Sequence, residues 1–204
     1  MSIATIILAA GNSSRLGGEP KQLLRHDGQT LVRRIANEAL SLQAGPVVVV
    51  VGANRDRIEA ELVNLSLSTP YNANWREGLA TSLQTGLAAI SAEPVDAFLV
   101  LLTDQPFVTV DLLRQLIAVR QQTGLGIIAS RYPDSESDTS GVLGVPALFD
   151  IRYKADFMKL SGDVGARKLI RQYPDDCAEV PFPLASIDLD TWQDVDAWRR
   201  VGGI

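Results

Sequence analysis

The sequence has one cysteine and one histidine in 204 residues, and these scarcities exclude several kinds of chemistry. With Cys177 alone the chain forms no internal disulfide, which favours a reducing compartment. A zinc site needs three or four Cys, His or acidic ligands, and a serine–histidine–acid triad would depend on His26 alone. His26 stands in the turn-like stretch LLRHDGQT, where an exposed turn histidine is the simpler interpretation. A bound metal is therefore expected to be a hard cation that prefers oxygen ligands.

Runs of lysine or arginine are also absent, and the formal net charge is −5. A surface that binds nucleic acid or an anionic membrane needs a local basic patch. The N-terminal stretch MSIATIILAAG lacks a basic leading region, and its apolar run is too short to span a membrane as a helix. We therefore expect a cytoplasmic protein that binds neither nucleic acid nor membrane.

Short apolar runs alternate with amphipathic stretches along the whole chain. The length and the 46% hydrophobic content suit one globular domain over residues 1–204. The runs are apolar throughout, which is typical of parallel strands covered on both faces. Strands are expected at Ile3–Ala9, Pro46–Ala53, Val95–Asp104 and Gly124–Arg131.

Helices are expected between and after these strands. Thr30 and Thr109 stand at N-cap positions, and a leucine stripe marks a helix over Leu79–Ile90. Two further helices are expected over Gly162–Arg171 and Trp192–Val201. This alternation predicts a three-layer α/β/α sandwich, Rossmann-like, with a mostly parallel sheet. Ligands of such folds bind where the strands end at their carboxyl edge.

The stretch LAAGNSSRLGGEPKQLL follows the first expected strand, and two common phosphate motifs can be tested on it. The dinucleotide fingerprint G-x-G-x-x-G fails, because Asn12 and Ser13 follow Gly11. The Walker pattern fails as well, because Leu16 stands at its second glycine. Hydride transfer on this loop and a P-loop NTPase are both disfavoured.

What remains is a glycine-rich loop with two cations, Arg15 and Lys21. Glycine lets backbone N–H groups approach an anion, and the two cations can clamp a triphosphate. A solvated surface loop is the alternative interpretation. The pattern resembles L-A-A-G-x-[GS]-x-R-x-G-x-x-K, the signature of nucleotidyltransferases with a GT-A-like fold.

The resemblance extends over nearly the whole chain, to the MobA-like NTP transferase family and within it to the molybdenum cofactor cytidylyltransferase (MocA-like) branch. The segments that carry it occur in the family's order: LAAGNSSRLGGEPKQLL, NANWREGLATSLQTGL, LLTDQPFV, SGVLGVPALF, LSGDVGARKLI and IDLDTWQDVDAW. One departure is Val145, which stands where that branch usually has a polar residue, often histidine, and which bears on how the pterin is held.

The resemblance implies a Mg²⁺-dependent nucleotidyltransferase that moves CMP from CTP to a phosphorylated pterin, molybdopterin, and releases pyrophosphate. It also implies transient contact with a molybdoenzyme or its chaperone. Three alternatives stay open: a GTP-dependent guanylyltransferase, a sugar-phosphate or methylerythritol-phosphate cytidylyltransferase, and a non-catalytic protein that binds and delivers nucleotide or cofactor.

Asp104 is the leading metal candidate, because it places a carboxylate at the end of a buried strand. An aspartate that only bonds its own turn is the alternative. The resemblance assigns a second metal carboxylate to Asp188, with Asp190 holding the neighbouring turn. It assigns Arg15 and Lys21, catalytic together with Asp104, to the phosphates.

The resemblance also implies a set of nucleotide contacts. These involve Leu8, Ala10, Gly11, Gly78 and Ser82, besides Arg15 and Lys21. Ser82 would meet the base or ribose, unless it is an ordinary helix-surface serine. The segment with Asp163 and Arg167 resembles the family's stretch near the acceptor, although Asp163 is more simply a helix N-cap. Among the tryptophans, only Trp75 is a candidate to line the pocket.

Overall fold

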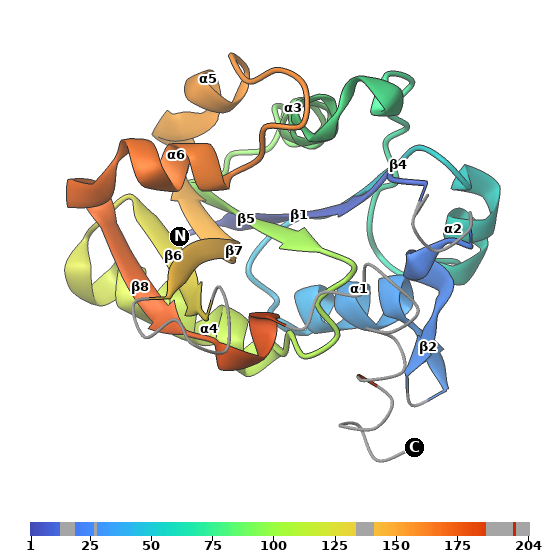
Figure 1. Cartoon of the computed structure of the whole chain (residues 1–204), viewed down its shortest axis with the longest axis horizontal. Coiled ribbons are helices and arrows are strands. Elements are labelled where there is room, and N and C mark those ends of the chain that lie inside the picture. The colour runs from blue at the N-terminus through green and yellow to red at the C-terminus, as the bar shows by residue number, and fades with distance from the viewer. Residues whose placement is uncertain (13–18, 27, 134–140, 187–197, 199–204) are drawn as a thin grey trace.

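A computed structural model describes residues 1–12, 19–26, 28–133, 141–186 and 198 of the chain. Its main feature is a six-stranded sheet with the order β4-β1-β5-β7-β6-β8, drawn in Figure 1. The strands are β1 (Ile3–Ala9), β4 (Val47–Val51), β5 (Ala97–Leu102), β6 (Ile127–Tyr132), β7 (Val142–Asp150) and β8 (Cys177–Pro181). A separate two-stranded ribbon pairs β2 (Arg25–His26) with β3 (Gln29–Thr30).

The sheet is mostly parallel, as predicted. Strand β7 alone in the sheet runs antiparallel, between β5 and β6. The other neighbouring pairs, β1 with β4, β1 with β5, and β6 with β8, are parallel. The four expected strands are confirmed, whereas β7 and β8 were not predicted as strands.

Helices cover both faces of the sheet and make three layers (Figure 1). They are α1 (Leu31–Ser41), α2 (Arg55–Glu61), α3 (Leu79–Ala89), α4 (Val110–Thr123), α5 (Lys154–Phe157) and α6 (Arg167–Gln172). One apolar cluster joins the sheet to α1, α2 and α4, and a second joins it to α3, α5 and α6. The expected helix at Trp192–Val201 falls almost entirely outside the described residues.

Alternate side chains of each central strand enter different clusters. Ile7 and Ala9 of β1 pack toward α1, while Ile6 and Leu8 pack toward α3. Every residue of β1 is buried, and the same holds for β4. This two-sided burial explains why these strands are apolar at every position except Thr5 rather than alternating.

Of the two threonines predicted as helix N-caps, one makes the capping hydrogen bond and the other does not. The Thr109 hydroxyl accepts a hydrogen bond from the backbone N–H of Leu112 at 3.4 Å, so this N-cap of α4 is confirmed. Thr30 does stand at the N-cap position of α1, but its hydroxyl donates to Glu61 Oε2 at 3.0 Å and makes no cap bond. The predicted start of α1 is right, and the predicted bond is wrong.

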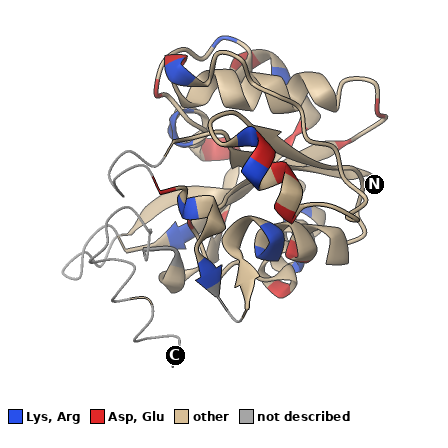
Figure 2. Cartoon of the chain, turned by 90° about the vertical axis from the view of Figure 1, so that its right-hand side faces the viewer, with Lys and Arg blue, Asp and Glu red and all other residues tan. Residues whose placement is uncertain are grey.

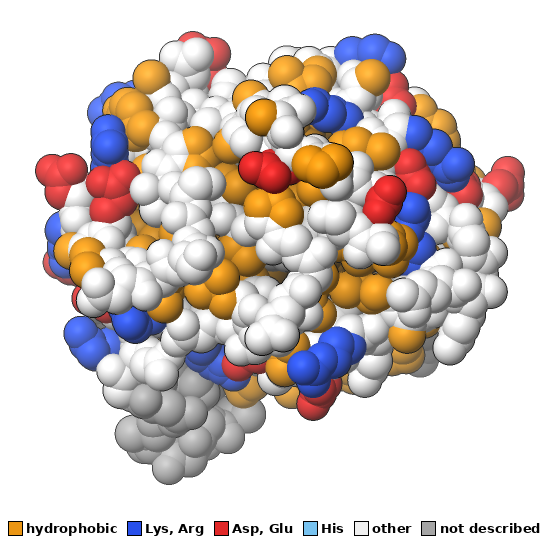
Figure 3. Space-filling model, turned by 180° about the vertical axis from the view of Figure 1, so that it is seen from behind, with side chains coloured by type: hydrophobic (Ala, Val, Ile, Leu, Met, Phe, Trp, Pro, Cys, Tyr) orange, Lys and Arg blue, Asp and Glu red, His pale blue; other side chains and the backbone are white. Residues whose placement is uncertain are grey.

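The surface of the described chain carries charges of both signs. Lysine and arginine lie among aspartate and glutamate on the side seen in Figure 2. From behind, hydrophobic side chains reach the surface in patches separated by polar groups (Figure 3). No helix in the described segments is long and apolar enough to cross a membrane.

Candidate active site

The site is built where β1 and β5 end side by side. Leu8 of β1 pairs with Leu102 of β5 in parallel register. The segments that follow, 10–12 and 103–105, therefore leave the sheet together at its carboxyl edge. The carbonyl of Ala10 accepts a hydrogen bond from Ala53 N at 2.9 Å, which ties the end of β4 to the same place. The start of the glycine-rich loop, at Gly11 and Asn12, thus shares one edge of the sheet with Asp104.

Lys21 and Asp104 meet at this edge although 83 residues separate them. Lys21 opens a short 3-10 turn, η2 (Lys21–Leu23), and its ammonium forms an ion pair with Asp104 Oδ2. Gln22 anchors the turn: it is 1% exposed, and its Nε2 donates to the carbonyl of Gly11 at 2.9 Å. Sequence reasoning missed Gln22, because a single glutamine carries no motif of its own.

The second carboxylate oxygen of Asp104 is the feature that fits a metal. Oδ1 is buried and has no hydrogen-bond partner among the described residues. A buried oxygen of this kind costs free energy until a donor or a cation satisfies it. Nowhere in the described segments do three or more His, Cys, Asp or Glu side chains gather as metal ligands. The single orphaned oxygen of Asp104 fits a divalent cation of the kind that is held by one or two carboxylates together with substrate phosphates.

Two of the predicted site residues cannot be placed beside this pair. Arg15 and Asp188, like Asp190, lie outside the described residues.

The free thiol of Cys177 lies away from this pair, on β8, and its pKa is raised to about 11 by burial and by the carboxylates of Glu179 and Asp176. Cys177 is therefore protonated at neutral pH and is a poor nucleophile.

A first hollow of about 520 Å³ opens in front of Gly11 and Asn12. Several of the predicted nucleotide contacts share it. Its lining includes Gly11, Asn12, Trp75, Gly78, Ser82 and Asp163. The Arg76 guanidinium lies 4.2 Å from the centre of the Trp75 ring, so one face of this indole is already stacked on a cation.

Ser82 is held in the wall of the first hollow by a buried amide. Ser82 is 4% exposed, and its Oγ accepts a hydrogen bond from Asn72 Nδ2 at 3.0 Å. The same Nδ2 donates to Thr81 Oγ1 at 2.9 Å. Because Asn72 supplies a donor, the Ser82 hydroxyl proton is left to donate, and no acceptor for it occurs in the described part of the chain. Ser82 is therefore a positioned donor rather than a surface serine, and sequence reasoning missed Asn72.

Gly78 joins the first hollow to the segment that precedes α6. Its φ of +112° is one that side chains rarely adopt, and a Cβ there would lie 2.3 Å from the carbonyl carbon of Gly162. Next to it, Ala80 N donates to the Gly162 carbonyl at 3.1 Å. The segments WREGLATSL and LSGDVGAR, both among those that carry the family resemblance, are thus in direct backbone contact.

Replacing Gly78 by alanine is expected to lower the free energy of unfolding by about 3 kcal/mol and to raise the KM for nucleotide. The added methyl group would push the two segments apart. Gly124→Ala is the matched control, because Gly124 also has a positive φ, +70°, but nothing lies within 4 Å of its Cβ position. The control should lose about 1 kcal/mol and keep its KM. Equal effects of the two substitutions on KM would contradict this role of the contact.

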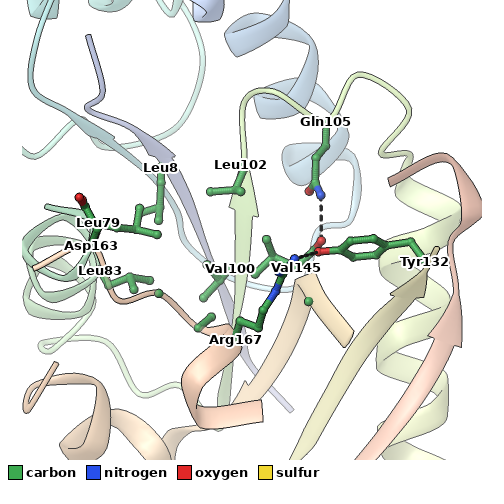
Figure 4. Close-up of a pocket in the computed structure, with 13 residues that line it drawn as sticks. Leu8, Leu79, Leu83, Val100, Leu102, Gln105, Tyr132, Val145, Asp163 and Arg167 are labelled. Carbon is green, nitrogen blue, oxygen red and sulfur yellow. Dashed lines mark hydrogen bonds between the residues drawn. The ribbon is translucent and has the colours of Figure 1, made fainter. Parts of the chain in front are cut away.

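A second cavity of about 250 Å³ lies beside the first hollow. Leu79 and Asp163 line both. Leu8, predicted as a nucleotide contact, has its side chain in the wall of the second cavity (Figure 4). Asp163 is not a helix N-cap, since α6 begins at Arg167 with Ala166 at its N-cap position. That prediction is wrong because Gly162 and Asp163 form a turn, and the helix starts only at Arg167.

Comparison of the sequence with known protein families identifies a family to which the chain belongs. Residues 5–177 match the MobA-like NTP transferase domain family. The chain belongs to this family. The match includes β1 from Thr5 onward, the glycine-rich loop, Asp104 and the Gly78–Gly162 contact. It assigns the protein to the nucleotidyltransferases and so to the enzymes.

The chain is similar to one protein that is named as an oxidoreductase and to several proteins of known structure. The chain is 35% identical over 177 residues to nicotine blue oxidoreductase of Paenarthrobacter nicotinovorans, covering 84% of this chain and 83% of the relative. Among solved structures, Rv0371c of Mycobacterium tuberculosis H37Rv superposes with a TM-score of 0.81 at 26% identity, covering 100% of this chain and 98% of the other.

Two further solved structures share the fold. Rv0371c has also been determined in complex with manganese, and that structure superposes with a TM-score of 0.77 at 24% identity, covering 100% and 99% of the two chains. A nucleotidyl transferase from Methanothermobacter thermautotroptrophicus gives a TM-score of 0.78 at 23% identity over 98% and 97%. The architecture of this family member is therefore the GT-A-like nucleotidyltransferase fold.

Proposed function

We propose that the protein transfers CMP from CTP to the phosphate of molybdopterin, with release of pyrophosphate. One observation carries the proposal: the first hollow and the second cavity adjoin at Leu79 and Asp163, at the same sheet edge as the Lys21–Asp104 pair. A nucleotide in one and a phosphorylated acceptor in the other would meet at this edge.

The reaction needs little proton chemistry. A terminal phosphate oxygen of the acceptor attacks the α-phosphorus of CTP and forms a new P–O bond. The bond from the α-phosphorus to the bridging oxygen breaks, and its electron pair leaves with pyrophosphate. Because the nucleophile is already an anion, no general base is required, which suits a chain with one histidine. Positioning and neutralisation of charge supply the catalysis.

The residues divide this work among them. Backbone N–H groups of the loop at Gly11 would face the phosphates, and Ser82 would donate its hydroxyl proton to the base or ribose. The Lys21 ammonium would stabilise the departing pyrophosphate together with Arg15. A divalent ion held by Asp104, with Asp188 as the proposed second carboxylate, would neutralise charge on the triphosphate. The manganese complex of the mycobacterial relative supports such an ion, and Mg²⁺ is the proposed one.

The nucleotide is tested with purified protein, molybdopterin and each of CTP, GTP, ATP and UTP in the presence of Mg²⁺. Pyrophosphate release is expected with CTP at a rate at least about tenfold above the other three, since specificity of this size needs little more than 1 kcal/mol. A preference for GTP would identify a guanylyltransferase. Nucleotide binding without pyrophosphate release would identify the non-catalytic delivery protein and refute the proposal.

A second candidate function is favoured by the 35% identity to nicotine blue oxidoreductase. An oxidoreductase on this scaffold would need a reductant, and a reduced nicotinamide dinucleotide that gives up a hydride (two electrons with one proton) is the donor that can be tested first. The glycine-rich loop lacks the dinucleotide fingerprint, which weighs against this function. Oxidation of a reduced nicotinamide dinucleotide by the protein in the presence of nicotine blue, and no pyrophosphate release, would favour it.

A further inference from the structure

Two short segments bring the Lys21 and Asp104 side chains together, and both lie outside the central sheet. The first is the 3-10 turn η2, which Lys21 opens and which ends with Leu24 at its C-cap. The Leu24 carbonyl accepts a hydrogen bond from Leu31 N at 2.8 Å. Since Leu31 is the first residue of α1, this bond ties the turn to that helix. It does not fix how far Lys21 stands from Asp104.

The second segment follows β5 and carries Asp104. Gln105 holds its first part, because Gln105 is 4% exposed and its Nε2 donates to the carbonyl of Val145 at 2.9 Å. The Val108 N–H donates to the Gln105 carbonyl at 3.3 Å and closes a turn. Phe107 thus stands in a tight turn just past Asp104.

A small apolar cluster joins these two segments, and we call it the Trp198 cluster. Its buried members are Leu31, which is 2% exposed, and Trp198, which is 1% exposed. Leu24 from the first segment and Phe107 from the second pack against this pair. Trp198 has the largest side chain among the fully buried residues that the structure describes. An indole buries roughly 150–250 Å² of surface, so Trp198 forms the greater part of the cluster.

The spacing along the chain connects the Trp198 cluster to the ion pair. Leu24 stands three residues after Lys21, and Phe107 stands in the same relation to Asp104. The Lys21 and Asp104 side chains are 19% and 13% exposed, and an ion pair that water reaches does little to hold two segments in place. Burial of apolar side chains is the stronger force. The cluster therefore sets the separation of the segments, and the ion pair forms across it.

We propose that Trp198 is a positioning residue for nucleotidyl transfer, which holds the Lys21 and Asp104 segments at the separation that the reaction needs. Trp198 lines neither the first hollow nor the second cavity, so it acts through the two charged residues. It also lies beyond residues 5–177, the stretch that matches the family. The inference rests on the proposed function only for the reaction whose rate is measured.

Amide hydrogen exchange tests the positioning without any turnover. The Leu24 N–H, which donates to the Lys21 carbonyl at 3.1 Å, reports on the first segment. The Val108 N–H reports on the second. In Trp198→Leu we expect both amides to exchange with deuterium about tenfold faster, measured by NMR, because both segments lose the same partner.

Turnover of the same variant is measured with CTP, Mg²⁺ and molybdopterin. We expect kcat to fall by about 10–100-fold while the KM for CTP stays within about twofold, because a small displacement of the lysine and the aspartate acts on the reacting phosphates. Trp198→Phe keeps an aromatic ring in the cluster and should restore kcat to within about threefold of the unmodified protein.

Phe157→Leu is the matched control for lost packing. Phe157 is 0% exposed, and its ring centre lies 5.3 Å from that of Phe98 and 4.9 Å from that of Phe149. Phe98 stands near the start of β5, at the opposite end of this strand from Asp104, and Phe157 lines neither hollow. The control should lower the melting temperature, yet keep kcat within about twofold and leave the exchange of both reporter amides unchanged.

Three outcomes would overturn the inference: faster exchange in one segment or in neither, a loss of kcat no larger than that of Phe157→Leu, or a raised KM with kcat unchanged. If Trp198→Leu fails to fold, Trp198→Phe decides, since its smaller ring should still speed the exchange of both amides by about twofold. Normal pyrophosphate release by Trp198→Leu would refute the inference and leave the proposed function standing. If the unmodified protein releases no pyrophosphate, the proposed function fails, and amide exchange still decides whether Trp198 holds the segments.

Discussion

Asp104→Asn is expected to lower the rate of pyrophosphate release by about 10²–10³-fold while nucleotide still binds. The substitution keeps the shape of the side chain and removes the charge that pairs with Lys21 and would hold the divalent ion. The loss should therefore appear in kcat, and it should be accompanied by weaker binding of Mn²⁺, measured by electron paramagnetic resonance of the free ion.

The control for this variant lies at the other end of the same strand. Asp96 directly precedes β5, and its Oδ2 accepts a hydrogen bond from Ser2 N at 2.7 Å. Asp96→Asn changes the same residue type far from the site and should keep the rate within about twofold, since exposed positions away from a site change little. An Asp104→Asn variant with normal turnover and normal Mn²⁺ binding would remove this carboxylate from the chemistry.

Lys21→Met is expected to lower turnover and to strengthen the binding of Mn²⁺. Turnover should fall by about 10²–10³-fold, because the ammonium no longer stabilises the leaving pyrophosphate. Binding of Mn²⁺ without nucleotide should become tighter, because Asp104 loses the cation that now sits on its Oδ2. A residue that merely supported the fold would weaken both.

Lys154→Met is the matched control for the lysine. The Lys154 ammonium donates to Ser91 Oγ at 2.6 Å on the exposed surface and lines neither hollow. It should change neither turnover nor Mn²⁺ binding. Weaker Mn²⁺ binding in Lys21→Met would mean that the ion pair organises the site rather than competing with the metal.

The central sheet could be predicted from sequence because its strands are buried on both faces. A continuous apolar run as short as Val47–Val51 is typical of a strand that is covered by helices on its two sides. The direction of β7 could not be predicted, because composition does not say whether a buried strand runs parallel or antiparallel. β7 also contains Gly144 and Pro146, which lower the strand signal.

Apart from the contacts that the family resemblance implied, such as Ser82, the site was predictable from its charged residues and glycines. Lys21 and Asp104 were predicted separately, and the structure brings them together. The buried carboxamides of Gln22, Asn72 and Gln105 escaped prediction, because a neutral polar residue outside a motif looks the same whether it is exposed or buried. Their roles depend on partners that are distant in sequence, such as Val145 for Gln105.

The site at the ends of β1 and β5 is most directly tested by following the phosphates of CTP. CTP labelled at the α-phosphorus and CTP labelled at the γ-phosphorus would each be incubated with the protein, Mg²⁺ and molybdopterin. We predict that the α-label appears in the acceptor and that the γ-label appears in pyrophosphate. Transfer of the γ-label to the acceptor, its release as orthophosphate, or no transfer of either label would contradict the account.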